Sequence, residues 1–568
     1  MTRAPLDRLT VEGDWNRDTL FAHPLSDITA YVRAVSWTWG MVQDDQMLAP
    51  PMQATITLSN ETGAWNPGRA DALFTALCKP NTLVRLRHPG NTQSDNVILQ
   101  GRIQRLQVTP GQFGPRTAQL IITDWSNEMQ QVIYDPPFAK NTSPGAALAQ
   151  MFATAVAPIP YADYWWVMDA EALGTGTRLF DSSAYVDIDS AVNVALPWVG
   201  DNLDAGGLGV NAAAFAEEMC VAEMSGRLWY HPALRKVIYR GRNWWAQNWN
   251  ASLALNITGA DILQESEYIR RDPVNYFELI CYPRAVGAAG TTLFSIGSPI
   301  RINRGEVRQI NARFRDPNSP EKSCGATTIV PLVAGTDYVA NTRSDGTGSV
   351  ATSSVGISYE QQMGALRMNI SNNSSSDDLF LTTLQVRGTP LTTGDAVHIT
   401  SVSASSIAAY GTWKESRVLG STGDLEQVQQ FADLYVNRYG NPVTGWSRVV
   451  LNVEDSGPGY ELAIARAHQL NLPLRISDAW TESPSAEYYW AAGVSQTIDV
   501  DSGTWTISLL VEQITRQTSW RLALTQEVVI LQPRPLGALG TSFLQTYNAS
   551  TITEAAFSIL DVTTTLGF

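Results

Sequence analysis

Cysteine is scarce in this chain of 568 residues, and its four thiols lie far apart. Cys78, Cys220, Cys281 and Cys324 form no Cys-x-x-Cys pair, the spacing that structural zinc sites and redox motifs use. A dense disulfide framework, which is typical of short secreted chains, is not indicated either. We therefore expect four buried free thiols, no metal site and no cofactor.

Charged residues are also sparse, at 16% of the chain, and their balance is acidic. With 39 Lys and Arg against 54 Asp and Glu, the formal net charge is −15 at pH 7. Phosphate contacts need clustered Lys and Arg, so this balance argues against a nucleic-acid-binding surface. It is compatible with a conduit that passes DNA without holding it, because such a wall would lack a basic lining.

Long apolar runs are missing too. The N-terminal segment Met1–Arg8 contains no apolar core of a signal peptide, and no run elsewhere approaches the length of a membrane span. We therefore expect synthesis in a cytoplasm and no membrane span.

The common catalytic motifs are absent: Gly-x-Ser-x-Gly, His-Glu-x-x-His, Walker A and Gly-x-Gly-x-x-Gly. The five histidines are scattered, and none has a Cys or Asp neighbour at ligand spacing. Asp499–Gly503 begins like a calcium loop but has no Glu at the twelfth position, so a hairpin turn is predicted. We predict no enzyme, although paired acids for glycoside hydrolysis need not be neighbours in sequence and stay open.

Tryptophan, in contrast, is plentiful, with 18 residues. The pairs Trp165-Trp166 and Trp244-Trp245 could stack on the apolar faces of sugar rings, or they could serve as buried interface anchors. The sequence favours the interface role.

Short β-type runs fill the first 125 residues, separated by Gly, Pro and Asn. They are Ala30–Trp39, Met52–Leu58, Thr82–Arg87, Val97–Val108 and Thr117–Thr123. Ala54, Ile56 and Leu58 alternate with polar residues, as in a half-buried strand. These runs predict a barrel or a sandwich.

The next segment predicts helices and a hairpin. Ser143-Pro144 is a good helix start, with the helix over Ala146–Ala155, and a second helix is expected over Ala212–Ala222. Arg227–Tyr230 and Lys236–Arg240 then predict a hairpin.

Between residues 405 and 477 the pattern predicts helix, strand, helix and strand. Asp424 is a candidate N-cap for a helix that ends near Tyr439, before Gly440. Ser447–Asp455 alternates as a strand, Glu461–Leu470 predicts a short helix, and Leu472–Ser477 predicts a further strand.

This order of elements resembles the second tube-like domain of phage tail-tip and baseplate hub proteins. The resemblance lies in Ser-Ile-Ala-Ala-Tyr-Gly at Ser406–Gly411, Ala-Asp-Leu-Tyr-Val-Asn-Arg-Tyr at Ala432–Tyr439, and the strand Leu472–Ser477. The Gly-Arg-Ile step in Ile98–Ile103, followed by the Asp124-Trp125 step, is similar to the first tube-like domain of the same family.

The resemblance implies a mainly β, multidomain fold with α/β elements. It places a first tube-like β-barrel domain in residues 1–130 and an α/β domain with the helix–hairpin unit in 131–272. A second tube-like domain would combine residues 273–286, starting from the strand Asn275–Tyr282, with 400–480. Residues 287–399 would form an inserted immunoglobulin-like sandwich, and 481–568 a β-rich C-terminal region.

The function that the resemblance implies is structural. Three chains would form a ring at the distal end of a phage tail that closes or extends the tail tube and provides the path for genome ejection. The expected partners are two further copies, the tail tube or distal tail protein, the tape-measure protein, and tail fibres or other tip proteins, with DNA only in transit. A host-glycan receptor and a tail-associated cell-wall hydrolase are the alternatives.

Overall fold

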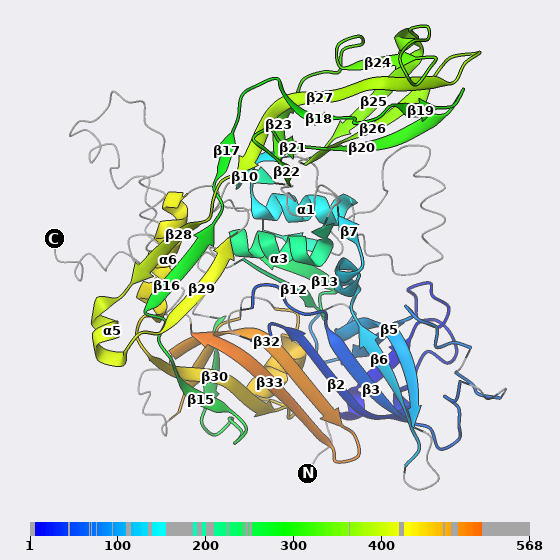
Figure 1. Ribbon diagram of the computed structural model, residues 1–568. Coiled ribbons are helices and arrows are strands. Elements are labelled where there is room, and N and C mark those ends of the chain that lie inside the picture. Colours follow the sequence, from blue (N-terminus) through cyan, green and yellow to red (C-terminus); the bar gives the residue numbers. More distant parts are fainter. Residues whose placement is uncertain are drawn as a thin grey trace, which may run out of the picture. The chain divides into compact units, whose positions relative to one another are not determined.

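The computed structural model (Figure 1) describes residues 6–513 with gaps. The gaps are residues 44–45, 68, 70, 75, 94, 110–114, 135–138, 155–185, 190–195, 200–209, 224–225, 242–243, 245–247, 249–252, 363, 420–424, 470–471 and 479–486. The described part is mainly β, with several sheets and few helices, so the predicted mainly β, multidomain fold class is confirmed.

The largest element is a sheet of 12 strands. Its first half, the N-terminal unit, holds β1 (Thr10–Gly13), β2 (Val32–Gly40), β3 (Gln53–Ser59), β4 (Leu83–Arg87), β5 (Val97–Thr109) and β6 (Thr117–Thr123). The strands run antiparallel in the order β1-β4-β5-β6-β3-β2. The predicted strands are all present in this unit, because their alternating apolar residues supply one buried face.

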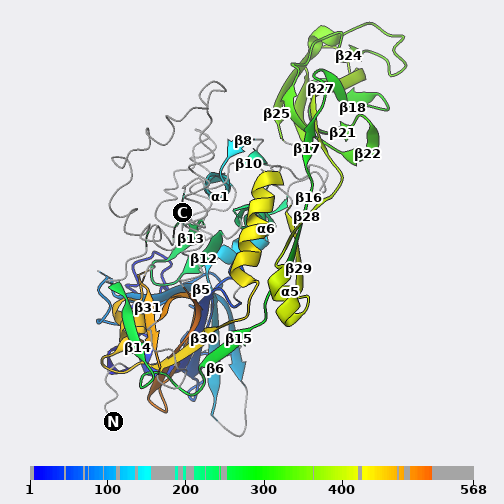
Figure 2. The same cartoon turned by 90° about the vertical axis from the view of Figure 1, so that its left-hand side faces the viewer.

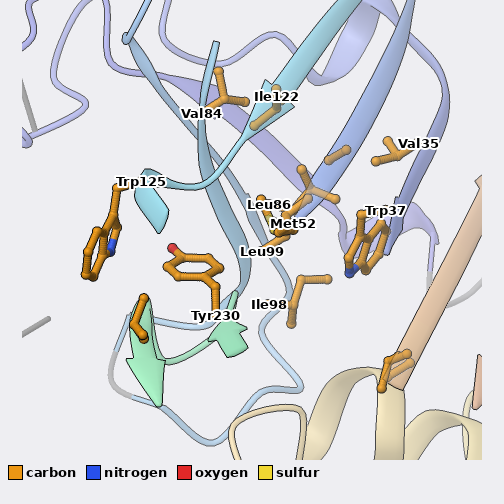
Figure 3. Packing of buried hydrophobic residues seen from close by; sticks show 14 of the residues in the cluster. Val35, Trp37, Met52, Val84, Leu86, Ile98, Leu99, Ile122, Trp125 and Tyr230 are labelled. Carbon is orange, nitrogen blue, oxygen red and sulfur yellow. The ribbon is translucent and has the colours of Figure 1, made fainter. Parts of the chain in front are cut away.

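The core of this unit is aromatic and aliphatic (Figure 3). Trp37, Met52 and Ile122 are buried on its inner face. Tyr230 reaches this core from the neighbouring hairpin, and its hydroxyl donates to the carbonyl of Gln100 at 3.0 Å.

The second half of the sheet, the C-terminal unit, has strands from two separate parts of the chain, residues 255–271 and 443–513. They are β14 (Leu255–Thr258), β15 (Glu267–Arg271), β30 (Val443–Asn452), β31 (Leu474–Ser477), β32 (Glu487–Asp499) and β33 (Thr504–Gln513). The hairpin β32–β33, predicted to belong to a separate C-terminal region, is central to this unit. In Figure 1 these orange strands lie beside the blue strands β2 and β3.

One predicted strand lies elsewhere. Asn275–Tyr282 was expected to start the second tube-like domain, but β16 (Tyr276–Cys281) lies in a three-stranded sheet with β28 (Val397–Val402) and β29 (Lys414–Leu419). Both edges of β16 are paired there, so it has no free edge for β30. The strands β14 and β15, which the sequence did not indicate, take the corresponding places beside β31 and β30.

Helix α6 (Leu425–Tyr439) covers this small sheet (Figure 2). Its Tyr435 ring stacks on Phe277 of β16, with ring centroids 4.0 Å apart. The helix has the predicted end at Tyr439, whereas the predicted cap Asp424 lies outside the described residues. α5 (Ala404–Tyr410) precedes it, and the predicted helix at Glu461–Leu470 is shorter, with α7 (Pro458–Tyr460) followed by the π-helical turn η7 (Glu461–Ala465).

In the chain between β6 and β14, the described residues form two helices and three small sheets. α1 (Pro144–Thr154) is capped by Ser143, whose hydroxyl accepts from the Ala146 amide at 3.2 Å, and α3 (Ala212–Ala222) has the predicted bounds. The hairpin β12 (Arg227–His231) and β13 (Lys236–Arg240) pairs with β9 (Val186–Ile188). The remaining strands are β7 (Ile133–Tyr134), β8 (Ala139–Thr142), β10 (Leu196–Val199) and β11 (Val210–Asn211), and the described 3-10 turns are η1 (Leu6–Arg8), η2 (Thr29–Tyr31), η3 (Trp125–Gln130) and η6 (Thr352–Ser354).

A β-sandwich is inserted between β16 and β28. One sheet is built on β27 (Leu379–Thr393), with β17 (Arg284–Val286), β18 (Thr291–Ser295), β19 (Ile300–Ile302), β23 (Gly325–Ile329) and β24 (Tyr338–Asn341). The other holds β20 (Val307–Arg313), β25 (Val355–Gln361) and β26 (Ala365–Asn372), and β21 (Arg315–Asp316) pairs with β22 (Ser319–Ser323). The two sheets enclose a hydrophobic core of their own.

Deleting residues 284–395 and joining the ends with a short Gly/Ser bridge is expected to leave the rest of the chain folded. The sandwich has a separate core, and the Cα partners Cys281 and Val397 hold its two ends together in the β16–β28 ladder. Circular dichroism and the melting temperature of the truncated chain test this. Loss of all soluble protein would contradict it.

Candidate assembly surface

The two halves of the large sheet have the same topology. Numbered by chain order within each unit, the strands of the N-terminal unit lie in the order 2-3-6-5-4-1. The C-terminal unit, β15-β30-β33-β32-β31-β14, repeats that order. One pairing differs, because β14 is parallel to β31 whereas β1 is antiparallel to β4.

The match extends to a β-bulge. In the N-terminal unit the register of β5 against β6 shifts between Ile103 and Arg105. In the C-terminal unit the register of β32 against β33 shifts between Ala491 and Gly493. A bulge inserts one residue at a defined place, so its recurrence aligns Arg105 with Gly493.

The units are joined by β2 and β32, which pair antiparallel from Ala34–Asp499 to Gly40–Gly493. Gly40 has φ of +80°, which only glycine adopts readily. A Cβ on Gly493 would lie 1.9 Å from the Met41 carbonyl oxygen. The close approach of the two backbones therefore depends on this glycine pair.

One side of the junction is apolar. Trp37 of β2 packs against Trp505 of β33, with ring centroids 6.5 Å apart. The indole nitrogen of Trp505 donates to the buried side-chain oxygen of Gln496 at 3.0 Å. One continuous hydrophobic core thus runs beneath both units.

The opposite side, which we name the polar face, carries hydroxyl groups. The strands β3, β2, β32 and β33 are neighbours, and their paired residues on this side are mostly serines and threonines. The Thr38 hydroxyl donates a hydrogen bond to the Ser495 hydroxyl at 3.1 Å. The polar face comprises Ser36, Thr38, Thr55, Thr57, Ser495, Thr497, Thr506 and Ser508, all partly or fully exposed. None of these side chains is charged.

A buried ion triad ties three elements together. Glu512 of β33 accepts from Arg227 of β12, and its other carboxylate oxygen lies 2.6 Å from Nη2 of Arg438 in α6. The Glu512 and Arg438 side chains are 8% and 6% exposed. The triad therefore fixes the C-terminal unit against the hairpin and α6.

Of the four tryptophans singled out from the sequence, the structure describes only Trp244; Trp165, Trp166 and Trp245 lie outside the described residues. The Trp244 ring is partly buried, with the Arg240 guanidinium 4.6 Å from its centroid. It packs against a cluster that includes Trp229 and Trp490. A role for these tryptophans in glycan or subunit contact stays a prediction.

Burial shifts the pKa of several titratable side chains in the described part of the chain. The four cysteines are free there, and burial raises the pKa of the Cys78 thiol to about 12. Burial also lowers the pKa of His231 to about 3, so its imidazole is neutral at pH 7. The described residues hold no cluster of metal-ligating side chains and no helix that could span a membrane.

A cavity of about 60 Å³ lies between the junction and the β12–β13 hairpin. It is lined by apolar side chains, including Trp39 and Val494, and by Arg227 and Arg466. A space of this size holds a handful of water molecules.

In the sandwich, Arg387 donates two hydrogen bonds to the carboxylate of Asp337, from Nε to Oδ1 at 2.6 Å and from Nη2 to Oδ2 at 3.0 Å. This hydrogen bond lowers the pKa of Asp337 below its ordinary value. A lowered folded-state pKa gives stability that is present above the unfolded pKa, about 3.9, and is lost as the pH falls through the folded one.

We therefore expect Asp337→Asn to destabilise the sandwich at pH 6 and to matter progressively less as the pH falls below about 4. Hydrogen exchange of the β27 amides, corrected for intrinsic rates, measures the stability of the sandwich in the unchanged protein and in the Asp337→Asn variant at each pH. A difference between the two chains that grows on acidification would contradict it.

Comparison with known proteins gave matches only among solved structures; no family model and no curated protein matches the chain. A tail protein from Neisseria meningitidis MC58 is 7% identical, covers 90% of this chain and 98% of its own, and gives a TM-score of 0.44. The chain is similar to phage tail proteins. The 43 kDa tail protein of prophage MuSo2 from Shewanella oneidensis is 8% identical over 88% of this chain and 97% of its own, with a TM-score of 0.40.

A type VI secretion system component from E. coli, itself described as similar to the T4 bacteriophage tail proteins gp27 and gp5, is also similar. It is 6% identical and covers 85% of this chain and 73% of its own, with a TM-score of 0.35. These are proteins of the kind that the sequence resemblance predicts.

Proposed function

We propose that this chain is a structural protein of a phage tail, the hub at its distal end. Three copies form a ring that closes or extends the tail tube. The ring anchors other tip proteins and leaves a path for the genome. Its work is assembly, and no catalytic step is needed.

The observation that carries this proposal is the repeated six-strand unit. One chain contributes two units of the same topology, already joined side by side through β2 and β32. Three such chains can match the end of a tube of six equivalent subunits, because they supply six units in total. Closed cyclic symmetry is the usual solution for such an assembly.

The polar face suits the wall of the path. Lys and Arg on this wall would hold DNA through its phosphates, and that binding would weaken steeply with salt. Hydroxyl groups such as those of Thr55 and Thr497 offer no such fixed charge. Three chains of net charge −15 carry −45 together, so the apolar contacts between chains must outweigh their repulsion.

The partners follow from this place in the tail. The ring would meet the tail tube or distal tail protein on one side and the tape-measure protein in its path. The inserted sandwich, which has its own core, is the part we propose for fibres or other tip proteins.

Native mass spectrometry and electron microscopy of the purified full chain test the proposal. We expect particles of three chains whose averaged end-on views show six similar sectors around a channel. A chain that stays monomeric at high concentration, or a ring of six chains, would refute it.

A further inference from the structure

We propose that the loop of residues 14–22, which follows β1 and exposes Leu20, is a rigid knob that docks a second protein of the phage tail. We name it the knob loop. Its partner offers one apolar pocket to each chain of the ring, so it occurs in three copies or in a multiple of three. This inference rests on the proposed function and names a surface, separate from the inserted sandwich, by which the ring anchors another protein.

The backbone of the knob loop is strained. Arg17, Thr19 and Phe21 have φ of 59°, 65° and 55°. These values lie in the left-handed region, which suits glycine and is unfavourable for other residues, above all for a β-branched one such as Thr19. Three of the six non-glycine residues with positive φ in the described part of the chain fall in this one loop. Strain of this kind persists only where surrounding contacts impose it, and it gathers at functional sites.

Contacts on both sides of Leu20 hold the strained backbone in place. The Asp14 carboxylate is buried, and its Oδ2 accepts a hydrogen bond from the Thr19 amide at 2.7 Å. The Phe21 ring is buried too, and the guanidinium carbon of Arg85 in β4 lies 3.8 Å from its centroid. Because Thr19 and Phe21 flank Leu20 in sequence, the position of Leu20 is fixed from both directions.

Leu20 is held in water by this loop and is 71% exposed. An exposed leucine is ordinary by itself, but one between two strained and anchored neighbours is not. A second exposed leucine, Leu73, lies on the segment between β3 and β4 and is 47% exposed. That segment packs against the knob loop through Phe74 and Trp15, with ring centroids 6.0 Å apart. The two leucines thus belong to one packed pair of segments.

The C-terminal unit shows that the repeated topology does not need such a loop. Its connection from β14 to β15 is residues 259–266, which is shorter than the corresponding residues 14–31 between β1 and β2. Residues 259–266, all of them described, contain no non-glycine residue at positive φ and no exposed large hydrophobic side chain. The described residues of 453–473, which correspond to the segment that carries Leu73, contain neither feature. The strained loop and its leucines are therefore additions to one unit, as expected of a docking surface.

The repeat also sets the number of contacts. Three chains in a ring would supply six similar units but only three knob loops. A partner of six equivalent subunits would meet a knob at every second position, whereas a threefold partner meets one knob with each pocket. Thr19, Leu20 and Ala22 are exposed and uncharged, so the matching pocket is apolar and needs no fixed charge at its rim. A fixed loop loses little conformational freedom on binding, which is the physical use of the strain.

Leu20→Asp tests the proposal in phage particles assembled in cells that make only the variant chain. We expect these particles to keep the ring but to retain about tenfold less of one tail protein, because burying a leucine contributes at least that factor to affinity. That protein should occur in three copies, or a multiple of three, in unchanged particles. Quantitative mass spectrometry of purified particles measures both the retention and the copy number. The melting temperature of the purified full chain should stay unchanged, since Leu20 lies outside the core.

Val418→Asp is the matched control. Val418 lies on β29, is 57% exposed, and receives the same change from an aliphatic side chain to a carboxylate. Particles with this variant should keep their full set of proteins. Loss of the same protein from both variants would show that the added negative charge is responsible, and it would overturn the proposal.

Thr19→Gly separates the rigidity of the loop from its chemistry. Glycine adopts the φ of 65° without strain, so the melting temperature of the full chain should rise or stay equal. The loosened loop must be ordered on binding, so retention of the partner should fall about threefold although Leu20 is still present. Full retention of the partner in this variant would contradict the use given to the strain.

The outcomes distinguish this proposal from the hub function. Leu20→Asp particles with a complete ring and an unchanged set of proteins overturn the knob and leave the hub function standing. Loss of a protein present in six equivalent copies overturns the threefold partner. Failure of the purified variant to form the ring would mean that Leu20 contacts a second copy instead, which also overturns the proposal. If the unchanged chain forms no ring and is absent from tail particles, the hub function fails, and the knob fails with it.

Discussion

Replacing Glu512 with alanine is expected to lower the free energy of unfolding by about 3–5 kcal/mol. The substitution removes the carboxylate that both Arg227 and Arg438 contact, and both guanidinium groups stay buried. Taking one member from a buried ion cluster leaves charge in a medium that solvates it poorly. Urea unfolding followed by tryptophan fluorescence measures the loss.

The matched control is Asp501→Ala. Asp501 pairs with Arg33 at 3.1 Å, but the two side chains are 62% and 40% exposed. Water already solvates both groups, so this substitution should change the unfolding free energy by no more than about 1 kcal/mol. Equal effects of the two substitutions would show that the Glu512 triad is not a structural tie.

Replacing Gly493 with alanine is expected to disrupt the joint between the two units, with a loss of about 3 kcal/mol or more. The new Cβ would lie 1.9 Å from the carbonyl oxygen of Met41. That atom belongs to the backbone, so a side-chain rotation cannot relieve the clash, and β2 must move away from β32. Hydrogen exchange of the β2 and β32 amides, with urea unfolding, measures the result.

Ser495→Ala is the matched control for Gly493→Ala. Ser495 lies on the same strand and belongs to the polar face, and its hydroxyl accepts a hydrogen bond from Thr38 at 3.1 Å. Removing it should weaken the ladder by about 1 kcal/mol or less. If the Gly493→Ala variant were as stable as the Ser495→Ala variant, the close pairing of β2 and β32 would not depend on the pair Gly40 and Gly493.

The sequence by itself determined the local elements. α3 spans the predicted Ala212–Ala222, α6 ends at the predicted Tyr439, and β12 and β13 form the predicted hairpin. In each case the information lies within a few residues: a capping side chain, a helical or alternating period of apolar residues, or a short connection. The hairpin turn at Asp499–Gly503 was predicted for the same reason.

Only the tertiary structure decided which strands share a sheet. β2 and β32 are joined across more than four hundred residues, as the Thr38–Ser495 hydrogen bond shows with a separation of 457. A strand with alternating apolar residues can pair with any strand that has a free edge and lies over a hydrophobic core. Its sequence pattern therefore does not determine which strand it pairs with. For that reason Tyr276–Cys281 was predicted in the wrong sheet, and the second six-strand unit, divided by the sandwich, became visible only once its strands were paired.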